Sequence, residues 1–202
     1  MPPRAKQTYF NGLAAIWDTL PSPEDVSVKI RRFVERSCVP EKGWVLDAGC
    51  GTGILLPALL KQQGRARVLE ADFSEDMLRM NQRKTPDPRV CRTCADAVQL
   101  PMRPASLDLV LCFGLLPHLE DVDRALAEFL RVLKPGGALA VGHTMGSREL
   151  NAFHGSLAGP VSKDRLPPAR EVAKRLSRLG AVAVRAEEES AWYFVRAERA
   201  GQ

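Results

Sequence analysis

The segment VLDAGCGTG, residues 45–53, most constrains what this chain can fold into. It joins an apolar stretch to an acid, Asp47, and to three glycines at alternate positions, Gly49, Gly51 and Gly53. Glycine has no Cβ, so it accepts unusual dihedral angles and lets a ligand approach the backbone closely. A helix that begins after such a turn presents free N–H groups and the positive end of its dipole. The segment therefore predicts a strand, a turn and a helix that form a nucleotide-type pocket.

The spacing of the glycines separates two classes of cofactor. A dinucleotide site reads G-x-G-x-x-G, and its third glycine allows the helix to pack closely on the strand. Here that position is Ile54, and the third glycine falls one residue earlier. Asp47 is also unfavourable beside a pyrophosphate, whereas it suits a ligand with a positively charged amino-acid end. These features argue against a nicotinamide dinucleotide. A structural turn without a ligand remains the alternative.

The same segment resembles, residue for residue, motif I of the class I S-adenosylmethionine-dependent methyltransferases. Residues 130–141, LRVLKPGGALAV, are similar to the family's link between its fourth helix and fifth strand. Residues 9–18, YFNGLAAIWD, resemble the start of its small-molecule, ubiquinone/menaquinone-type branch (methyltransferase type 11). The resemblance covers nearly the whole chain. It implies a Rossmann-like fold, S-adenosylmethionine as the methyl donor and S-adenosylhomocysteine as the product.

Apolar stretches of strand and helix character alternate along the chain, which favours an α/β fold with a parallel sheet and helices on both faces. We predict strands at 44–48, 67–71, 90–95, 107–113, 138–143, 181–187 and 191–199. We predict helices from a Ser22 cap to 37, and at 54–63, 74–84, 121–133 and 168–179. Only a short turn separates the last two strands, so they must form an antiparallel hairpin. The expected architecture is a doubly wound, seven-stranded, mostly parallel sheet in one domain, 1–202, with an N-terminal helical cap over 1–40.

The composition is that of a globular protein, with 45% hydrophobic and 26% charged residues in 202. No stretch has the length and apolarity of a membrane span or a leader, so we expect a cytoplasmic protein. The five cysteines are odd in number and lie mostly in predicted strands, which favours reduced thiols. Few aromatic residues lie among the basic ones, so the net charge of +5 does not indicate a nucleic-acid groove. Nothing in the sequence indicates an oligomeric state.

Ligands of open α/β sheets bind beyond the carboxyl ends of the strands. Asp72 ends the second predicted strand and is similar to the family's ribose-binding acid, with Glu70 as a second candidate. Phe73 and Met77 would cover the adenine, although ordinary helix packing explains both equally well. Residues 94–101, CADAVQLP, resemble the family's adenine-reading turn.

The resemblance assigns further contacts along this edge. Asp96 would accept from the exocyclic amine of adenine, and the N–H of Ala97 would face a ring nitrogen. Backbone carbonyls at Cys112 and Phe113 would meet the ammonium group of the cofactor. The predicted cofactor residues are thus Asp47, Gly49, Cys50, Gly51, Gly53, Asp72, Phe73, Met77, Asp96, Ala97, Cys112 and Phe113. No metal site is predicted, because the two cysteines of C-x-x-C at 91–94 face opposite sides of a strand.

All three histidines follow the fourth or fifth predicted strand and are the candidate catalytic residues. We hypothesise that His143 and His154 bind or deprotonate the methyl acceptor, with or without a metal ion. The family commonly carries a histidine or a similar residue at the place of His118, which explains that residue without a catalytic role. Ser147 is predicted to cap a short helix on which Asn151 and His154 share a face.

Residues 144–166 form a connection longer than such units usually have, which indicates a lid or substrate wall. With the N-terminal helices it would roof a modest pocket, so a small-molecule acceptor is favoured. Residues 113–117 lack the Asn/Asp-Pro-Pro-aromatic motif of the family's DNA N-methylating subgroup. Two alternatives stay open: an RNA or protein acceptor, and a non-catalytic module that binds S-adenosylmethionine.

Overall fold

Seven strands form one sheet in the computed structural model, which describes residues 4–21, 25–62 and 64–201. The strand order is β3-β2-β1-β4-β5-β7-β6; the pairs among β1 to β5 are parallel, and β7 is antiparallel to both β5 and β6. The strands are β1 Trp44–Ala48, β2 Arg67–Asp72, β3 Val90–Cys94, β4 Leu107–Phe113, β5 Leu133–His143, β6 Ala181–Glu189 and β7 Trp192–Arg199. The predicted mostly parallel sheet with a C-terminal antiparallel hairpin is confirmed.

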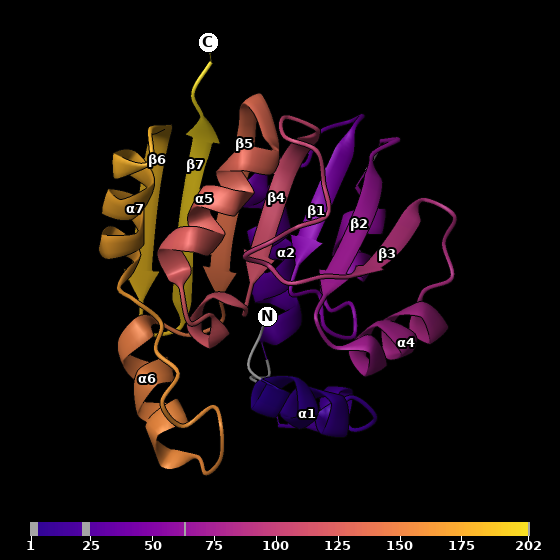
Figure 1. Cartoon of the computed structure of the whole chain (residues 1–202), viewed down its shortest axis with the longest axis vertical. Coiled ribbons are helices and arrows are strands. Elements are labelled where there is room, and N and C mark those ends of the chain that lie inside the picture. The colour runs from indigo at the N-terminus through magenta and orange to yellow at the C-terminus, as the bar shows by residue number, and fades with distance from the viewer. Residues whose placement is uncertain (1–3, 22–24, 63, 202) are drawn as a thin grey trace.

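The central strands are apolar along their length because helices cover both faces of the sheet. Successive side chains of a strand point to opposite faces. Accordingly, Leu46 and Val110 pack with helices α5 and α7, whereas Val45 and Leu109 pack with α2 and α3. Figure 1 shows α5 and α7 in front of the sheet and α2 behind it. The helices are α1 Arg4–Leu13, α2 Val26–Ser37, α3 Leu56–Leu60, α4 Glu75–Lys84, α5 Val122–Val132, α6 Ser147–Ser156 and α7 Ala169–Arg178, with short 3-10 turns η1 Trp17–Thr19 and η2 Leu116–His118.

The predicted helix over 54–63 is wrong in length, since α3 has only five residues. The glycines of the preceding turn, Gly49, Gly51 and Gly53, all have positive φ and keep the chain out of helical geometry through that turn. Pro57 is tolerated only in the first turn of a helix, and the helix indeed begins one residue before it. The glycine turn is therefore longer than the sequence suggested.

Strand β5 begins at Leu133, five residues earlier than predicted, and takes in the Pro135-Gly136-Gly137 turn. Leu107 pairs with Leu133 and Leu109 with Ala138, so the register shifts between these pairs. The proline and glycines form this irregularity inside the strand instead of a turn before it.

Helix starts were predicted with mixed success. Ser74 caps α4 by accepting a hydrogen bond from the Met77 N–H at 3.2 Å, as predicted. Ser147 does not cap α6; Gly146 holds that position, and the Ser147 hydroxyl donates to Glu188 instead. The predicted cap at Ser22 lies outside the described residues, and α2 is described from Val26.

Helices α1, α4 and α6 lie beyond the ends toward which the parallel strands point (Figure 1). Phe10 and Ala14 of the N-terminal region form a small apolar cluster there with Met77 of α4 and Val161. No helix among the described residues is long and apolar enough to cross a membrane. The N-terminal segment and the chain around α6 thus cover one edge of the sheet, where the predicted site residues lie.

Candidate cofactor and acceptor site

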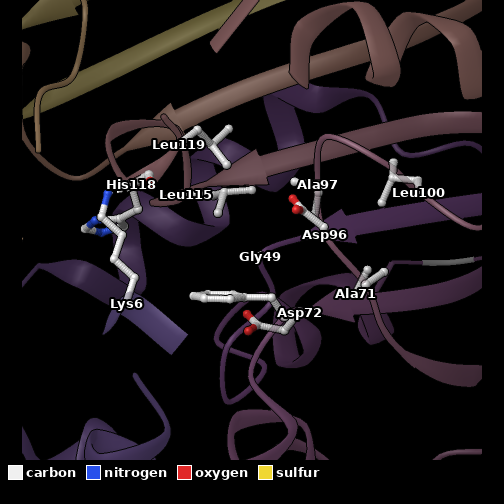
Figure 2. A pocket seen from close by; sticks show the side chains of 13 residues that line it. Lys6, Gly49, Ala71, Asp72, Asp96, Ala97, Leu100, Leu115, His118 and Leu119 are labelled. Carbon is white, nitrogen blue, oxygen red and sulfur yellow. Dashed lines mark hydrogen bonds between the residues drawn. The ribbon is translucent and has the colours of Figure 1, made fainter. Parts of the chain in front are cut away.

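A pocket opens at the carboxyl ends of β1 and β2, between the turns that follow β3 and β4. Its volume is about 490 Å³, counting the space open to solvent. Figure 2 shows Lys6 and His118 at one end and Ala71 and Leu100 at the other, with Asp72 and Asp96 between them. Of the predicted cofactor residues, five line this pocket: Gly49, Asp72, Phe73, Asp96 and Ala97. The other seven predicted cofactor residues are not among its lining residues.

The glycine turn is held against the end of β2. The N–H groups of Gly49 and Cys50 both donate to the Ala71 carbonyl, at 2.7 and 3.1 Å. A Cβ at Gly49 would lie 2.8 Å from the side chain of Leu115, which also lines the pocket. The absence of a side chain at Gly49 therefore lets the turn after β4 approach the turn after β1.

Asp72 receives two backbone hydrogen bonds from the turns beside it. Its Oδ2 accepts from the Gly51 N–H at 2.9 Å, and its Oδ1 accepts from the Ser74 N–H at 2.8 Å. Burial raises the pKa of this carboxyl group, and the backbone hydrogen bonds oppose that rise. Each oxygen keeps a further lone pair, so the fixed carboxylate can accept from two neighbouring hydroxyls of a ligand.

Asp96 and Ala97 lie in the turn after β3, on the side of the pocket that also holds Leu100. The Asp96 Oδ1 accepts from the Val98 N–H at 3.1 Å, and its carbonyl accepts from the Gln99 N–H. The turn is therefore ordered by Asp96 itself, which holds the side chain at the wall of the pocket (Figure 2).

A group of buried carboxyls lies beneath the glycine turn. Asp47 is 1% exposed and Glu70 is fully buried, and Glu70 accepts a hydrogen bond from Asn81 Nδ2 at 2.7 Å. Burial raises the pKa of Asp47 well above its ordinary value, with Glu70 and Asp72 adding to the effect. Among the described residues, Asp47 Oδ2 and Glu70 Oε1 have no hydrogen-bond partner. Asp47 thus offers a buried acceptor behind the turn.

Glu70 should make stability depend on pH. Burial raises its pKa in the folded protein to about 7, from 4.5, so the folded carboxyl keeps a proton that the unfolded chain loses between these values. The free energy of unfolding should therefore fall as pH rises through this window. Glu70→Gln cannot ionise, and it should reduce that fall by about 3 kcal/mol. Urea unfolding at pH 4.5 and 8 measures the difference. The exposed Glu75→Gln is the control, and an equal fall in all three proteins would contradict the assignment.

Four predicted cofactor residues contact other parts of the protein. Met77 packs with the apolar cluster around Phe10, outside the pocket lining. Cys112 is fully buried at the end of β4, and the ring of Phe113 lies 4.8 Å from that of Phe33. Cys50 is buried beside the carboxyls, and burial raises the pKa of its thiol, so it is not a reactive thiolate. Backbone contacts from Cys112 and Phe113 stay a prediction.

The three histidines gather where the covering segments meet. His118 lines the pocket, and its ring centre lies 5.3 Å from that of His154 on α6. His143, at the end of β5, accepts a hydrogen bond at Nδ1 from the Met145 N–H at 3.0 Å. Burial, followed by the nearby charges of His118 and His154, lowers the pKa of His143 to about 4. No group of three or more His, Cys, Asp or Glu side chains within the described parts of the chain is arranged to hold a metal ion.

Two further residues of this cluster were missed from the sequence. Asp164 is 6% exposed; its Oδ2 lies 2.6 Å from His118 Nδ1, and its Oδ1 lies 2.6 Å from Lys6 Nζ. Lys6 also donates to the His118 carbonyl at 2.9 Å. The three residues come from segments far apart in the chain, and no local pattern marks Lys6 or Asp164 as partners. Only the tertiary structure brings them together.

The N-terminal segment is also tied to the walls of the pocket. Gln7 donates to the Phe73 carbonyl at 2.8 Å, and the Ser74 hydroxyl donates to Asn11. Asp18 accepts from the Thr52 hydroxyl of the glycine turn at 2.6 Å. The segment therefore covers the pocket through polar contacts to the turns after β1 and β2.

Comparison with known proteins finds a family model that matches part of the chain. Residues 46–141 match the model of a methyltransferase domain family (Methyltransf_11). The chain is 38% identical over 102 residues to a malonyl-[acyl-carrier protein] O-methyltransferase of Methylovorus, covering 47% of this chain and 34% of the relative. It is 35% identical over 108 residues to a ubiquinone/menaquinone biosynthesis C-methyltransferase of Desulfotalea psychrophila, covering 53% and 44%. The chain thus spans between a third and a half of the length of these curated relatives.

Solved structures extend the likeness to nearly the whole chain. A structure described as a complex between the Haloferax volcanii Trm112 methyltransferase activator and a methyltransferase superposes with a TM-score of 0.81. The match covers 95% of this chain and 97% of the other, at 18% sequence identity. At that identity the likeness concerns the fold alone.

Proposed function

We infer that this protein transfers a methyl group from S-adenosylmethionine to a small-molecule acceptor. Its residues 46–141 match the model of the methyltransferase domain family. The observation that carries the proposal is that Gly49, Asp72 and Asp96 line one pocket. Gly49 lies in the turn after β1, Asp72 ends β2, and Asp96 lies in the turn after β3. Asp72 suits the two hydroxyls of a ribose, Asp96 suits the amine of an adenine, and Gly49 lets the ligand approach the backbone closely.

The residues of the pocket fit S-adenosylmethionine in three respects. Asp72 has a lone pair left on each oxygen for the ribose hydroxyls, since its two hydrogen bonds come from backbone N–H groups. Asp96 and Ala97 stand at the wall where the adenine would lie. The unpartnered Oδ2 of Asp47 provides a buried hydrogen-bond acceptor for the ammonium group, reached through a water molecule.

The bound donor supplies a methyl group on a positively charged sulfur, which is already activated for in-line displacement. The protein then has to align the acceptor and exclude water, and alignment alone supplies much of the rate. The segments around α1 and α6 are placed for that task, because they cover the end of the pocket that holds His118. Of the three candidate histidines, His118 lines this end of the pocket and can bind a polar acceptor or accept its proton.

A small acceptor is favoured over a macromolecule because the far end of the pocket is covered. Lys6, Gln7 and Asn11 attach α1 over it. The named relatives act on malonyl-[acyl-carrier protein] and in ubiquinone or menaquinone biosynthesis, which supports an oxygen or carbon acceptor. The alternatives are an RNA or protein acceptor, which the covered end of the pocket disfavours, and a module that binds the donor without transfer.

A labelled-methyl assay tests this proposal. The purified protein is incubated with S-adenosylmethionine labelled in its methyl group and with pools of phenols, quinols, carboxylic acids and amines; total RNA and protein are offered in parallel. We expect label in a small-molecule fraction. Label only in RNA or protein would contradict a small acceptor, and firm donor binding without any labelled product would favour the non-catalytic module.

A further inference from the structure

We propose that Asp164 is a positioning residue that makes His118 the general base of this site, so that the acceptor must carry a proton on the atom that is methylated. The inference rests on the proposed function and deepens it, because it names the chemical class of the acceptor. It also separates the roles of the three histidines, which the sequence could not do.

The hydrogen-bond partners determine which ring nitrogen of each histidine carries the proton. A carboxylate only accepts, so His118 Nδ1, 2.6 Å from Asp164 Oδ2, must be the donor. The Nε2 of a neutral His118 is then a bare lone pair. At His143 the order is reversed, since Nδ1 accepts from the Met145 N–H and Nε2 carries the hydrogen. One ring can therefore take a proton from a ligand, whereas the other can only donate a hydrogen bond.

His154 is less suited to the role of base than His118. Its Nδ1 lies 3.3 Å from the Asp164 carbonyl oxygen, a longer and uncharged contact. It is 5% exposed and does not line the pocket, whereas His118 does. Asp164 thus contacts both rings, but its charged carboxylate contacts only His118, the ring that lines the pocket.

Three distant segments assemble the base. Lys6 comes from α1, His118 ends η2 after β4, and Asp164 follows α6. Figure 2 shows Lys6 beside His118 at the end of the pocket. Since Asp164 bridges Lys6 and His118, the base is complete only when α1 and the segment after α6 are both in place over the pocket. Deprotonation of the acceptor is thereby linked to exclusion of water.

The step balances as a displacement with loss of one proton. A bond forms between the acceptor atom and the methyl carbon, and the bond between that carbon and the sulfonium sulfur breaks. The bonding pair stays on sulfur, giving a neutral thioether. The proton of the acceptor goes to His118 Nε2, and Asp164 stabilises the resulting imidazolium. Hydroxyl, enol and amine acceptors fit this scheme, whereas a thioether or tertiary amine has no proton to give.

The charge on Asp164 and that on Lys6 act on His118 in opposite directions. The carboxylate favours the protonated ring, and the ammonium group disfavours it. The titratable groups that face His118 from the packed elements are Lys6 on α1, Asp72 at the end of β2, His143 on β5, His154 on α6 and Asp164. Removing one charge at a time therefore tests the assignment with a predicted sign.

The test is a pH titration of the histidine ¹⁵N signals in the full chain, with S-adenosylhomocysteine as the probe ligand. We expect His118 to carry its hydrogen on Nδ1 in the neutral form. Asp164→Asn should move its titration midpoint to lower pH, and Lys6→Met should move it to higher pH. Asp123→Asn, an exposed change on α5, is the matched control and should leave the midpoint unchanged.

Turnover of the small molecule that takes the label gives the second readout. Asp164→Asn should lower kcat roughly tenfold or more and shift the rising limb of the pH–rate profile to lower pH, while melting temperature and S-adenosylhomocysteine affinity stay near those of the parent. A hydrogen on Nε2 of His118, or a midpoint that moves in neither variant, would overturn the proposal. Failure of the donor to bind while the titration behaves as expected would instead count against the proposed function alone.

Discussion

Asp72→Asn is expected to weaken the binding of S-adenosylhomocysteine by about 100-fold. Hydrogen bonds to a charged group contribute roughly 1.5–3 kcal/mol each, and the proposed ribose contact has two. A loss of about 2.7 kcal/mol corresponds to a factor of 100 in the dissociation constant. The amide keeps the size of the side chain but loses the charge, and one of its two terminal atoms becomes a donor. Calorimetric titration of both proteins measures the change.

The control for this variant is Asp76→Asn, which changes an exposed acid in the first turn of α4. It should leave the affinity within about twofold. Because Asp72 also orders the Gly51 and Ser74 N–H groups, thermal melts must show that Asp72→Asn remains folded. Equal affinity in a folded Asp72→Asn protein would remove the ribose assignment.

Gly49→Ala is expected to lower the free energy of unfolding by about 2–5 kcal/mol. Gly49 has a φ of +72°, and a left-handed conformation costs a residue with a Cβ roughly 1–2 kcal/mol. The new Cβ would also lie 2.8–2.9 Å from three carbon atoms of Leu115, and such overpacking costs about 1–3 kcal/mol. Urea denaturation at neutral pH, without ligand, gives the value.

Gly51→Ala provides the matched control within the same turn. Its φ is +52°, but a Cβ there would meet no atom within 4 Å. It should show the backbone strain alone, about 1–2 kcal/mol. Similar losses in the two variants would mean that the contact between Gly49 and Leu115 does not determine how closely the two turns approach.

The strands and the cofactor edge could be predicted because their signals are local. An apolar run followed by turn residues predicts β1. Asp72 could be predicted as a site residue because it directly follows the apolar run of β2. The hairpin of β6 and β7 followed from the short turn between them. These features depend on residues close together in the sequence.

The parts that could not be predicted depend on tertiary contacts. The pairing of Leu107 with Leu133 extends β5 past a Pro-Gly-Gly segment that locally resembles a turn. Asp164 has no sequence pattern to connect it with His118 or Lys6, although the structure brings all three together. The histidines were found as candidates, but their ring nitrogens could be assigned only from the hydrogen bonds.

The central claim is that the pocket at the ends of β1 and β2 binds S-adenosylmethionine and not a dinucleotide. Calorimetric titration of the purified protein with S-adenosylhomocysteine and, separately, with NAD tests it most directly. We predict saturable binding of one S-adenosylhomocysteine per chain, weakened strongly by Asp72→Asn, and no heat of binding for NAD. Binding of NAD without S-adenosylhomocysteine, or binding of neither, would contradict the account.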